Sequence, residues 1–244
     1  MIDSVFISDL HLHPQDVLIS NRFARWVDWA VLHVKQVYIL GDFFHAWAGD
    51  DTLDAWSLGI AEQLMRFKKQ DIPVFFMHGN RDFLLGQHFA ELAGLQLLPE
   101  PTCICLGQKC VLLVHGDRYC TQDQRHQYFR WLTRNRWFTR LFLCLPKTWR
   151  MHLVAKVRQH SQTHRPARPE IMEIVPRALA RHAKLHHADI VIHGHTHRPK
   201  LEFVEAENHR FQHIILSDWD EDPPVLCYNQ TKGLFFQSFS FGET

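Results

Sequence analysis

Residues 37–42 read VYILGD, four apolar residues of strand type followed by a glycine and a carboxylate. Apolar runs that end in polar residues recur at residues 2–9, 73–80, 109–115 and 189–193. Helical apolar spacing lies between the first three runs, over residues 19–33 and 53–69. This strand–helix–strand–helix–strand order predicts a parallel sheet with right-handed crossovers.

The rest of the chain continues the pattern with one interruption. A helix is expected at residues 84–93, followed by a hairpin of residues 102–106 and 109–114 around Gly107 and Gln108. Residues 123–187 have a helical pattern without an evident strand. A β-rich finish follows at residues 189–193, 201–205, 211–216, 225–229 and 233–241. We therefore predict an α/β fold, a β-sandwich of mixed sheets flanked by helices, with a core of residues 1–122 and 169–244 and a helical lid insertion at 123–168.

The bulk properties limit where such a protein works. A length of 244 residues suits one large α/β domain or a core with an insertion. No stretch approaches the roughly 20 apolar residues of a membrane-spanning helix, and the N-terminus has no basic leader. The six cysteines show no paired zinc spacing, so we expect reduced, mostly buried thiols in a cytosolic protein.

The near-neutral charge of +1 conceals a strongly basic segment. Residues 125–168 hold nine arginines, two lysines and no acidic residue, a formal charge of +11, so the remainder of the chain carries −10. Large apolar residues alternate with the arginines, among them Tyr128, Trp131, Trp137 and Trp149. A basic, aromatic, helical segment indicates contact with a membrane or an acidic ligand. Ordinary helix packing is the alternative for the aromatic residues.

Most of the chemistry-bearing residues follow apolar runs and form one set: Asp9, His11, Asp42, Asn80, Arg81, His115, His193, His195 and His197. Asp9 and His11 are two apart, so in extended backbone both side chains point to one side, and His195 and His197 repeat that spacing. One such pair alone is more typical of a capped loop, but two at strand exits indicate two metal half-sites. A carboxylate between them, Asp42, is the natural bridge. Oxygen and nitrogen ligands without thiolate favour Mn²⁺, with Mg²⁺, Fe²⁺ or Zn²⁺ as alternatives.

Five motifs, in this order along the chain, resemble those of the calcineurin-like metallophosphoesterase superfamily: Asp9-Leu10-His11, Gly41-Asp42, Gly79-Asn80-Arg81-Asp82, His115-Gly116-Asp117 and Gly194-His195-Thr196-His197. Longer matches at residues 38–44, 78–86 and 193–199 resemble the UDP-2,3-diacylglucosamine hydrolases, pyrophosphatases of bacterial lipid A synthesis. The superfamily usually has histidine after the motif asparagine, whereas Arg81 stands here, as in those hydrolases.

The resemblance implies a metallophosphoesterase sandwich and a ligand set. Asp9, His11, Asp42 and His197 would hold the first metal, and Asp42, Asn80, His115 and His195 the second. Hydroxide from a water between two Mn²⁺ ions would attack the α-phosphorus of UDP-2,3-diacylglucosamine, giving UMP and 2,3-diacylglucosamine 1-phosphate. Arg81 and His195 would stabilise phosphoryl charge, with Asp42 and Asn80 completing the catalytic set. His193 and Asp117 are expected to support the ligands.

The resemblance also gives the insertion a role as the part that contacts the lipid substrate. Asp123 and Ser161 match lid residues that bind the glucosamine and acyl groups. Arg165 and Arg168 fall where the family has Asn and Lys, and the chain is one residue shorter there. The expected setting is the cytoplasmic face of the bacterial inner membrane, with the protein a peripheral monomer.

Three other functions compete with this interpretation. A nucleotide or phosphoprotein phosphatase could use the same metal core, but it has no need of a +11 aromatic lid. A metal-free binding scaffold predicts eroded ligands, whereas this ligand set is complete. Nucleic-acid binding through the arginine-rich segment is the third, and we expect no nucleic-acid partner.

Overall fold

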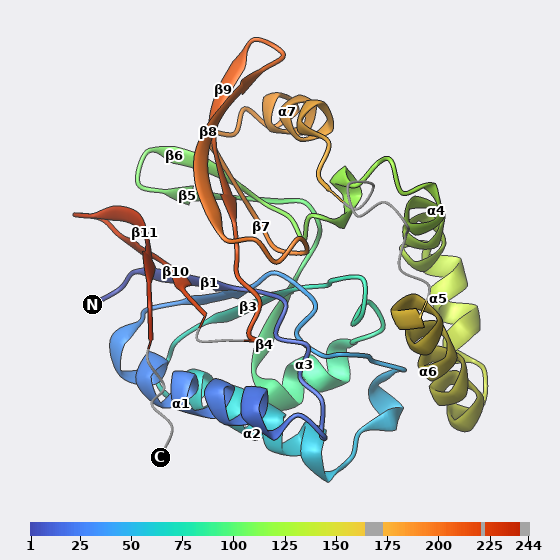
Figure 1. Cartoon of the computed structure of the whole chain (residues 1–244). Helices are drawn as coiled ribbons and strands as arrows, with labels where there is room; N and C mark the ends of the chain where they lie inside the picture. Colours follow the sequence, from blue (N-terminus) through green and yellow to red (C-terminus); the bar gives the residue numbers. More distant parts are fainter. Residues whose placement is uncertain (164–172, 221–222, 240–244) are drawn as a thin grey trace.

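Two mixed β-sheets packed face to face form the centre of the protein (Figure 1). The computed structural model describes residues 1–163, 173–220 and 223–239. The first sheet has the order β11-β10-β1-β2-β3-β4, with β1 Ser4–Ile7, β2 Val37–Ile39, β3 Val74–Met77, β4 Leu95–Leu98, β10 Val225–Asn229 and β11 Gly233–Gln237. The second has the order β5-β6-β7-β9-β8, with β5 Thr102–Leu106, β6 Lys109–Leu113, β7 Ile190–His193, β8 Lys200–Ala206 and β9 His209–Ile215.

The predicted mixed sandwich is confirmed. Strands β1 to β4 run parallel, as do β6, β7 and β9, while β10, β11, β5 and β8 pair antiparallel. Strand β4 was not predicted. Its sequence, LQLL, contains no β-branched or aromatic residue, so only its pairing with β3 identifies it as a strand.

Three apolar layers hold the sandwich together. Phe6, Leu40, Leu113 and Ile192 belong to the buried cluster between the sheets. Helices α1 (Val17–His33), α2 (Ala55–Lys69) and α3 (Gln87–Ala93) pack on the outer face of the first sheet, and α7 (Pro176–Leu185) packs on the second. The apolar spacing that predicted a helix over residues 19–33 matches the buried side chains of α1. The Asp16 carboxylate caps the first turn by accepting a hydrogen bond from Ile19 N.

Helices α4 (Gln124–Thr133), α5 (Arg136–Leu143) and α6 (Lys147–Thr163) lie beside this core, on one side of the sandwich (Figure 1). Buried or partly buried arginines attach them. Arg130 pairs with Glu100 and Asp117 at 2.8 and 3.0 Å, and Arg150, 2% exposed, pairs with Asp51 and donates to the carbonyl of Ala48. The predicted helical character of this stretch is confirmed, while the boundaries of a lid at 123–168 stay a proposal.

Candidate metal centre

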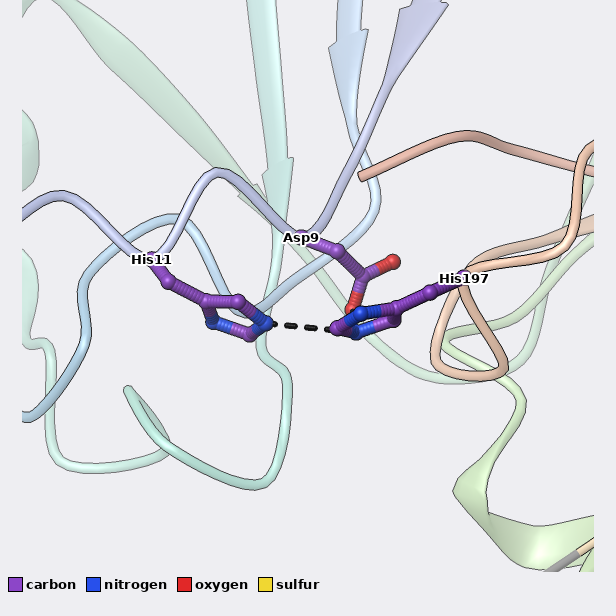
Figure 2. A group of neighbouring side chains, drawn as sticks. All are labelled: Asp9, His11 and His197. Carbon is purple, nitrogen blue, oxygen red and sulfur yellow. Dashed lines mark hydrogen bonds and ion pairs between the residues drawn. The ribbon is translucent and has the colours of Figure 1, made fainter. Parts of the chain in front are cut away.

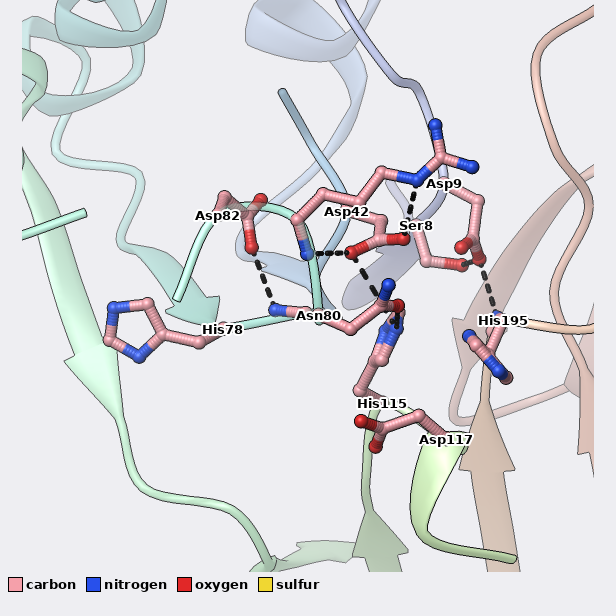
Figure 3. A network of polar contacts seen from close by, with 12 residues as sticks. Ser8, Asp9, Asp42, His78, Asn80, Asp82, His115, Asp117 and His195 are labelled. Carbon is pink, nitrogen blue, oxygen red and sulfur yellow. Dashed lines mark hydrogen bonds and ion pairs between the residues drawn. The ribbon is translucent and has the colours of Figure 1, made fainter. Parts of the chain in front are cut away.

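The structure brings six predicted ligands into two groups at the carboxyl ends of the parallel strands. Asp9, His11 and His197 form one group (Figure 2), and Asp42, His115 and His195 the other (Figure 3). Within each group the ligand atoms lie within 4.8 Å of one another. Asp42 faces both groups, since its Oδ2 lies 4.0 Å from His11 Nδ1 and its Oδ1 lies 3.7 Å from His115 Nε2. A carboxylate in that position can bridge two cations.

The seventh predicted ligand, Asn80, joins the second group. Its Oδ1 lies 3.1 Å from His115 Nε2 (Figure 3). The other ring nitrogen, His115 Nδ1, donates to the carbonyl oxygen of Leu40 at 2.8 Å. Nε2 is therefore the ring nitrogen that can bind a metal ion. The side chain of Asn80 can therefore offer its carbonyl oxygen beside that nitrogen.

Unusual backbone conformation aims these ligands. Five of the predicted ligands have φ between 51° and 70°, in the left-handed region that residues other than glycine rarely adopt. They are Asp9, His11, Asp42, His195 and His197. Two glycines make room for the loops: a Cβ at Gly79 would collide with the Asp42 carboxylate, and one at Gly194 with the Asp9 carboxylate. Strain concentrated at five of seven predicted ligands is typical of a functional site.

The donor atoms fit metal ions because several lack any other partner. Asp9 Oδ1 and His11 Nδ1 are buried without a hydrogen bond. His11 Nε2 and His197 Nε2 lie only 3.2 Å apart, with Asp9 Oδ1 3.4 Å from the latter (Figure 2). Two ring nitrogens and a carboxylate oxygen that converge in this way can all be satisfied by a cation. With oxygen and nitrogen donors and no thiolate, a divalent ion such as Mn²⁺, Fe²⁺, Zn²⁺ or Mg²⁺ suits the set.

Electrostatics divides the four histidines into two kinds. Burial lowers the pKa of His11 to about 3 and of His195 to about 4. Burial also disfavours the charged forms of His115 and His197, but Asp42 and other carboxylates raise the pKa of His115 to about 9, and Asp218 and Asp9 raise that of His197 to about 10. Each group therefore holds one protonated imidazole when no metal is bound, and a metal must displace that proton.

Neighbouring residues hold the ligands in place. Asp9 Oδ2 accepts from Ser8 Oγ and from His195 N at 2.6 and 2.8 Å (Figure 3). Asp82 accepts from Gly79 N and Phe43 N at 2.7 and 2.8 Å, and so ties the loops after β2 and β3 together. Asp218, which sequence reasoning missed, lies 3.1 Å from His197 Nδ1. It follows the apolar run of β9, the same strand-exit signal that identified the other sites.

Comparison with known proteins decides the family. A family model described as calcineurin-like phosphoesterase matches residues 4–199. A UDP-2,3-diacylglucosamine hydrolase of Shewanella oneidensis is 40% identical over 243 residues, 99% of this chain and 99% of that protein. One of Serratia proteamaculans is 38% identical over 226 residues, 92% of this chain and 94% of that protein. The chain belongs to the UDP-2,3-diacylglucosamine hydrolases.

Membership of the diacylglucosamine hydrolases confirms the resemblance drawn from the five motifs, and with it a metal-dependent hydrolase of the calcineurin-like phosphoesterase family. Among solved structures, an archaeal phosphodiesterase with 13% sequence identity covers 97% of this chain and 99% of its own, with a TM-score of 0.48.

A cluster of cationic side chains lies beside the predicted ligands. Arg81 Nε is 3.3 Å from Asp42 Oδ2, and its Nη1 is 3.3 Å from His45 Nδ1. Arg158, from α6, donates to Asn80 O at 3.2 Å. Burial, followed by the charge of Arg81, lowers the pKa of Arg158 to about 10. Arg158 belongs to the basic segment of residues 125–168, but no motif in the sequence predicted it at the site.

Of the four lid residues predicted from the resemblance, the structure describes Asp123 and Ser161. Asp123 caps α4, since its Oδ1 accepts from His126 N at 2.9 Å. Ser161 is exposed on α6. Arg165 and Arg168 lie outside the described residues.

His193 and Asp117, which were expected to support the ligands, are fully buried. His193 Nε2 lies 2.7 Å from His213 Nε2, and Asp117 pairs with Arg130.

Proposed function

We propose that the chain hydrolyses the diphosphate of UDP-2,3-diacylglucosamine at the α-phosphorus, giving UMP and 2,3-diacylglucosamine 1-phosphate for lipid A biosynthesis. The observation that carries this proposal is the pair of donor groups that share Asp42. The chain that holds them is 38–40% identical, over nearly its whole length, to UDP-2,3-diacylglucosamine hydrolases. Cleavage of a phosphoric anhydride requires a nucleophile and neutralisation of charge on both phosphoryl groups.

Two Mn²⁺ ions are the proposed cofactors. Asp9, His11, Asp42 and His197 would hold the first, and Asp42, Asn80, His115 and His195 the second. When bound, two such ions activate water at neutral pH and neutralise phosphoryl oxygens.

The residues of the chain itself orient and bind the diphosphate. Arg81 presents a planar guanidinium next to the bridging carboxylate, a geometry that suits two-point contact with phosphoryl oxygens. Arg158 adds a second cation, and no ion pair of Arg158 occurs in the described part of the chain. An anion between the two guanidiniums would relieve their mutual repulsion. Arg81 therefore acts by charge stabilisation rather than proton transfer, together with the ligands Asn80 and His195.

The insertion supplies a surface for the lipid. Its helices expose large apolar side chains, namely Tyr128 at 65%, Trp131 at 64%, Trp137 at 73%, Leu141 at 71% and Trp149 at 66%. Helix packing does not account for these residues, and α5 has no buried residue at all. The same helices expose Arg125, Arg136, Arg140, Lys147 and Lys156. Arg140 Cζ lies 5.8 Å from the ring centroid of Trp137. Tryptophan and arginine side by side suit the headgroup region of an anionic bilayer.

We accordingly place the protein on the cytoplasmic face of the inner membrane, as a peripheral monomer whose lid contacts substrate through Asp123, Ser161, Arg165 and Arg168. Among the described helices, none combines the length and apolar character needed to span a bilayer.

A substrate comparison tests the proposal. The manganese-loaded protein would be assayed with UDP-2,3-diacylglucosamine, UDP-N-acetylglucosamine and p-nitrophenyl phosphate, with product mass identifying the phosphorus attacked in H₂¹⁸O. We expect rapid hydrolysis of the acylated substrate alone, with ¹⁸O in UMP. Equal rates on all three would refute the lipid-specific function, and ¹⁸O in the sugar phosphate would refute attack at the α-phosphorus.

A further inference from the structure

Three of the six cysteines gather on one outer face of the β5–β6 hairpin. Ile104 and Val111 point into the core between the sheets, so Cys103, Cys105 and Cys110 point the other way, toward the end of α7. Cys103 and Cys105 are exposed and Cys110 is partly exposed, and only Cys120 and Cys227 are buried. The expectation of mostly buried thiols is therefore wrong.

Strand register makes two of these thiols immediate neighbours. Cys105 lies directly across from Cys110, next to the two-residue turn at Gly107 and Gln108. Both backbone groups of Cys110 bond to Asp189 instead of β5, through Cys110 N to Oδ2 at 2.8 Å and Asp189 N to Cys110 O at 2.9 Å. The two cysteines therefore form a non-hydrogen-bonded pair, the kind in which facing side chains approach most closely, with Cα atoms about 4.5 Å apart.

An imidazole completes the cluster from the end of α7. His186 Nδ1 lies 3.7 Å from Cys103 Sγ, and Cys110 Sγ lies 3.7 Å from the carbonyl oxygen of the same residue. Burial and the neighbouring Cys103 raise the pKa of the Cys110 thiol, as does Cys105. In a tetrahedral zinc site, bonds of about 2.3 Å to sulfur and about 2.0 Å to nitrogen place those two atoms roughly 3.6 Å apart. The observed separation of Cys103 and His186 is close to that edge length.

We propose that Cys103, Cys105, Cys110 and His186 form a binding site for a soft metal ion such as Zn²⁺, separate from the hydrolytic centre. Three thiolates and one imidazole are a ligand set that zinc favours. Binding replaces the thiol protons with the metal ion, and the protons pass to solvent.

We expect this site to close by rotation of its exposed side chains. No three of the four ligand atoms lie within 4.8 Å of one another. Among the described residues, the two groups of the hydrolytic centre meet that spacing. Cys103 and Cys105 are exposed, so each can change its χ1 rotamer without disturbing the core. The bound ion would join α7 to the hairpin from which β6 leads to His115. The turn of this hairpin points away from α4 to α6 (Figure 1).

Cobalt spectroscopy on the reduced full-length protein separates this site from the hydrolytic centre. The centre has no thiol ligand, so near-ultraviolet thiolate-to-Co²⁺ charge-transfer bands report the cysteine cluster alone. We expect these bands to rise to a plateau as Co²⁺ is added and to disappear on addition of Zn²⁺. Cys105→Ser, Cys110→Ser and His186→Ala should each weaken Co²⁺ binding at least tenfold, since loss of a ligand costs at least as much as loss of a supporting residue, about 10–100-fold.

Cys144→Ser, which removes an exposed thiol on the insertion, is the matched control and should leave the bands unchanged. Hydrolysis rates should be unaltered in Cys105→Ser, an exposed position where a failure to fold is not expected. Absence of thiolate bands in the wild-type protein, or their persistence in Cys110→Ser, overturns the proposal. A Cys105–Cys110 disulfide in protein purified without reductant, with no cobalt bands after reduction, also overturns it and identifies the pair as a redox site.

Discussion

Replacement of Arg158 by methionine should stabilise the free protein and nevertheless remove most of its activity. The guanidinium is held with a pKa of about 10 rather than 12.5, because of burial and of the nearby charge of Arg81. At 1.36 kcal/mol for each pKa unit, holding the charged form costs about 3 kcal/mol. Methionine keeps the apolar stem but loses the hydrogen bond to Asn80 O, worth about 1 kcal/mol. A net gain of about 2 kcal/mol corresponds to a Tm higher by roughly 4–8 °C for a chain of this size.

The sign reverses when a diphosphate is bound, because the uncompensated charge then has an anion to pair with. Loss of about 3 kcal/mol from binding in the transition state lowers kcat/KM by ~100-fold. The measurements are thermal unfolding in chelator and kcat/KM for UDP-2,3-diacylglucosamine.

Arg150→Met, on the same helix, is the matched control. Arg150 is equally long and more deeply buried, but it is paired with Asp51 and donates to Ala48 O and Leu145 O. Its removal leaves those acceptors without a partner and should lower the Tm. A Tm decrease in Arg158→Met similar to that in Arg150→Met, or an unchanged kcat/KM, would refute the reasoning.

Four other outcomes follow from the metal centre and the insertion. Asp42→Ala should reduce turnover by orders of magnitude while circular dichroism stays unchanged, and retained activity would show that the site is misread. Asp218→Asn should weaken binding of the first metal about 10–100-fold by calorimetry, with unchanged affinity arguing against its role in orienting His197. Because His197 has a raised pKa of about 10, its proton is bound below that pH and must leave; the Kd of the first metal should therefore fall about tenfold per pH unit between pH 6 and 8, and a pH-independent Kd would contradict this. Replacing both Arg136 and Arg140 with glutamine should weaken sedimentation with anionic vesicles about 30-fold, at about 1 kcal/mol per charge, whereas equal binding would leave the lid without its proposed surface.

Local sequence predicted the ligands because their positions follow from a simple rule of the fold. Parallel strands bring their carboxyl ends to one edge, so polar residues just after apolar runs meet there. The strand-end positions grouped Asp9, Asp42 and His115, and the family resemblance then identified them as predicted ligands. Arg158 could not be found in this way, because α6 reaches the site only through tertiary packing, and a long arginine gives no periodic signal. The same limit applied to the thiols, where strand register rather than spacing made Cys105 and Cys110 neighbours.

Hydrogen bonds of the chain itself hold the loops that carry the predicted ligands. Each ligand in the left-handed region costs about 1–3 kcal/mol, so five of them persist only because their surroundings hold them there. The loops after adjacent strands supply that support by bonding to each other, through Asp9 N to Gly41 O at 3.1 Å and His11 N to Asp42 O at 3.0 Å. Gly194 N likewise donates to His115 O at 2.9 Å in the second sheet.

The loops thus continue the strand pairing beyond the sheets and carry the ligands on it. A substitution that disturbs one loop should therefore displace ligands of both metals together, whereas removal of a single side chain such as His11 should affect mainly its own group.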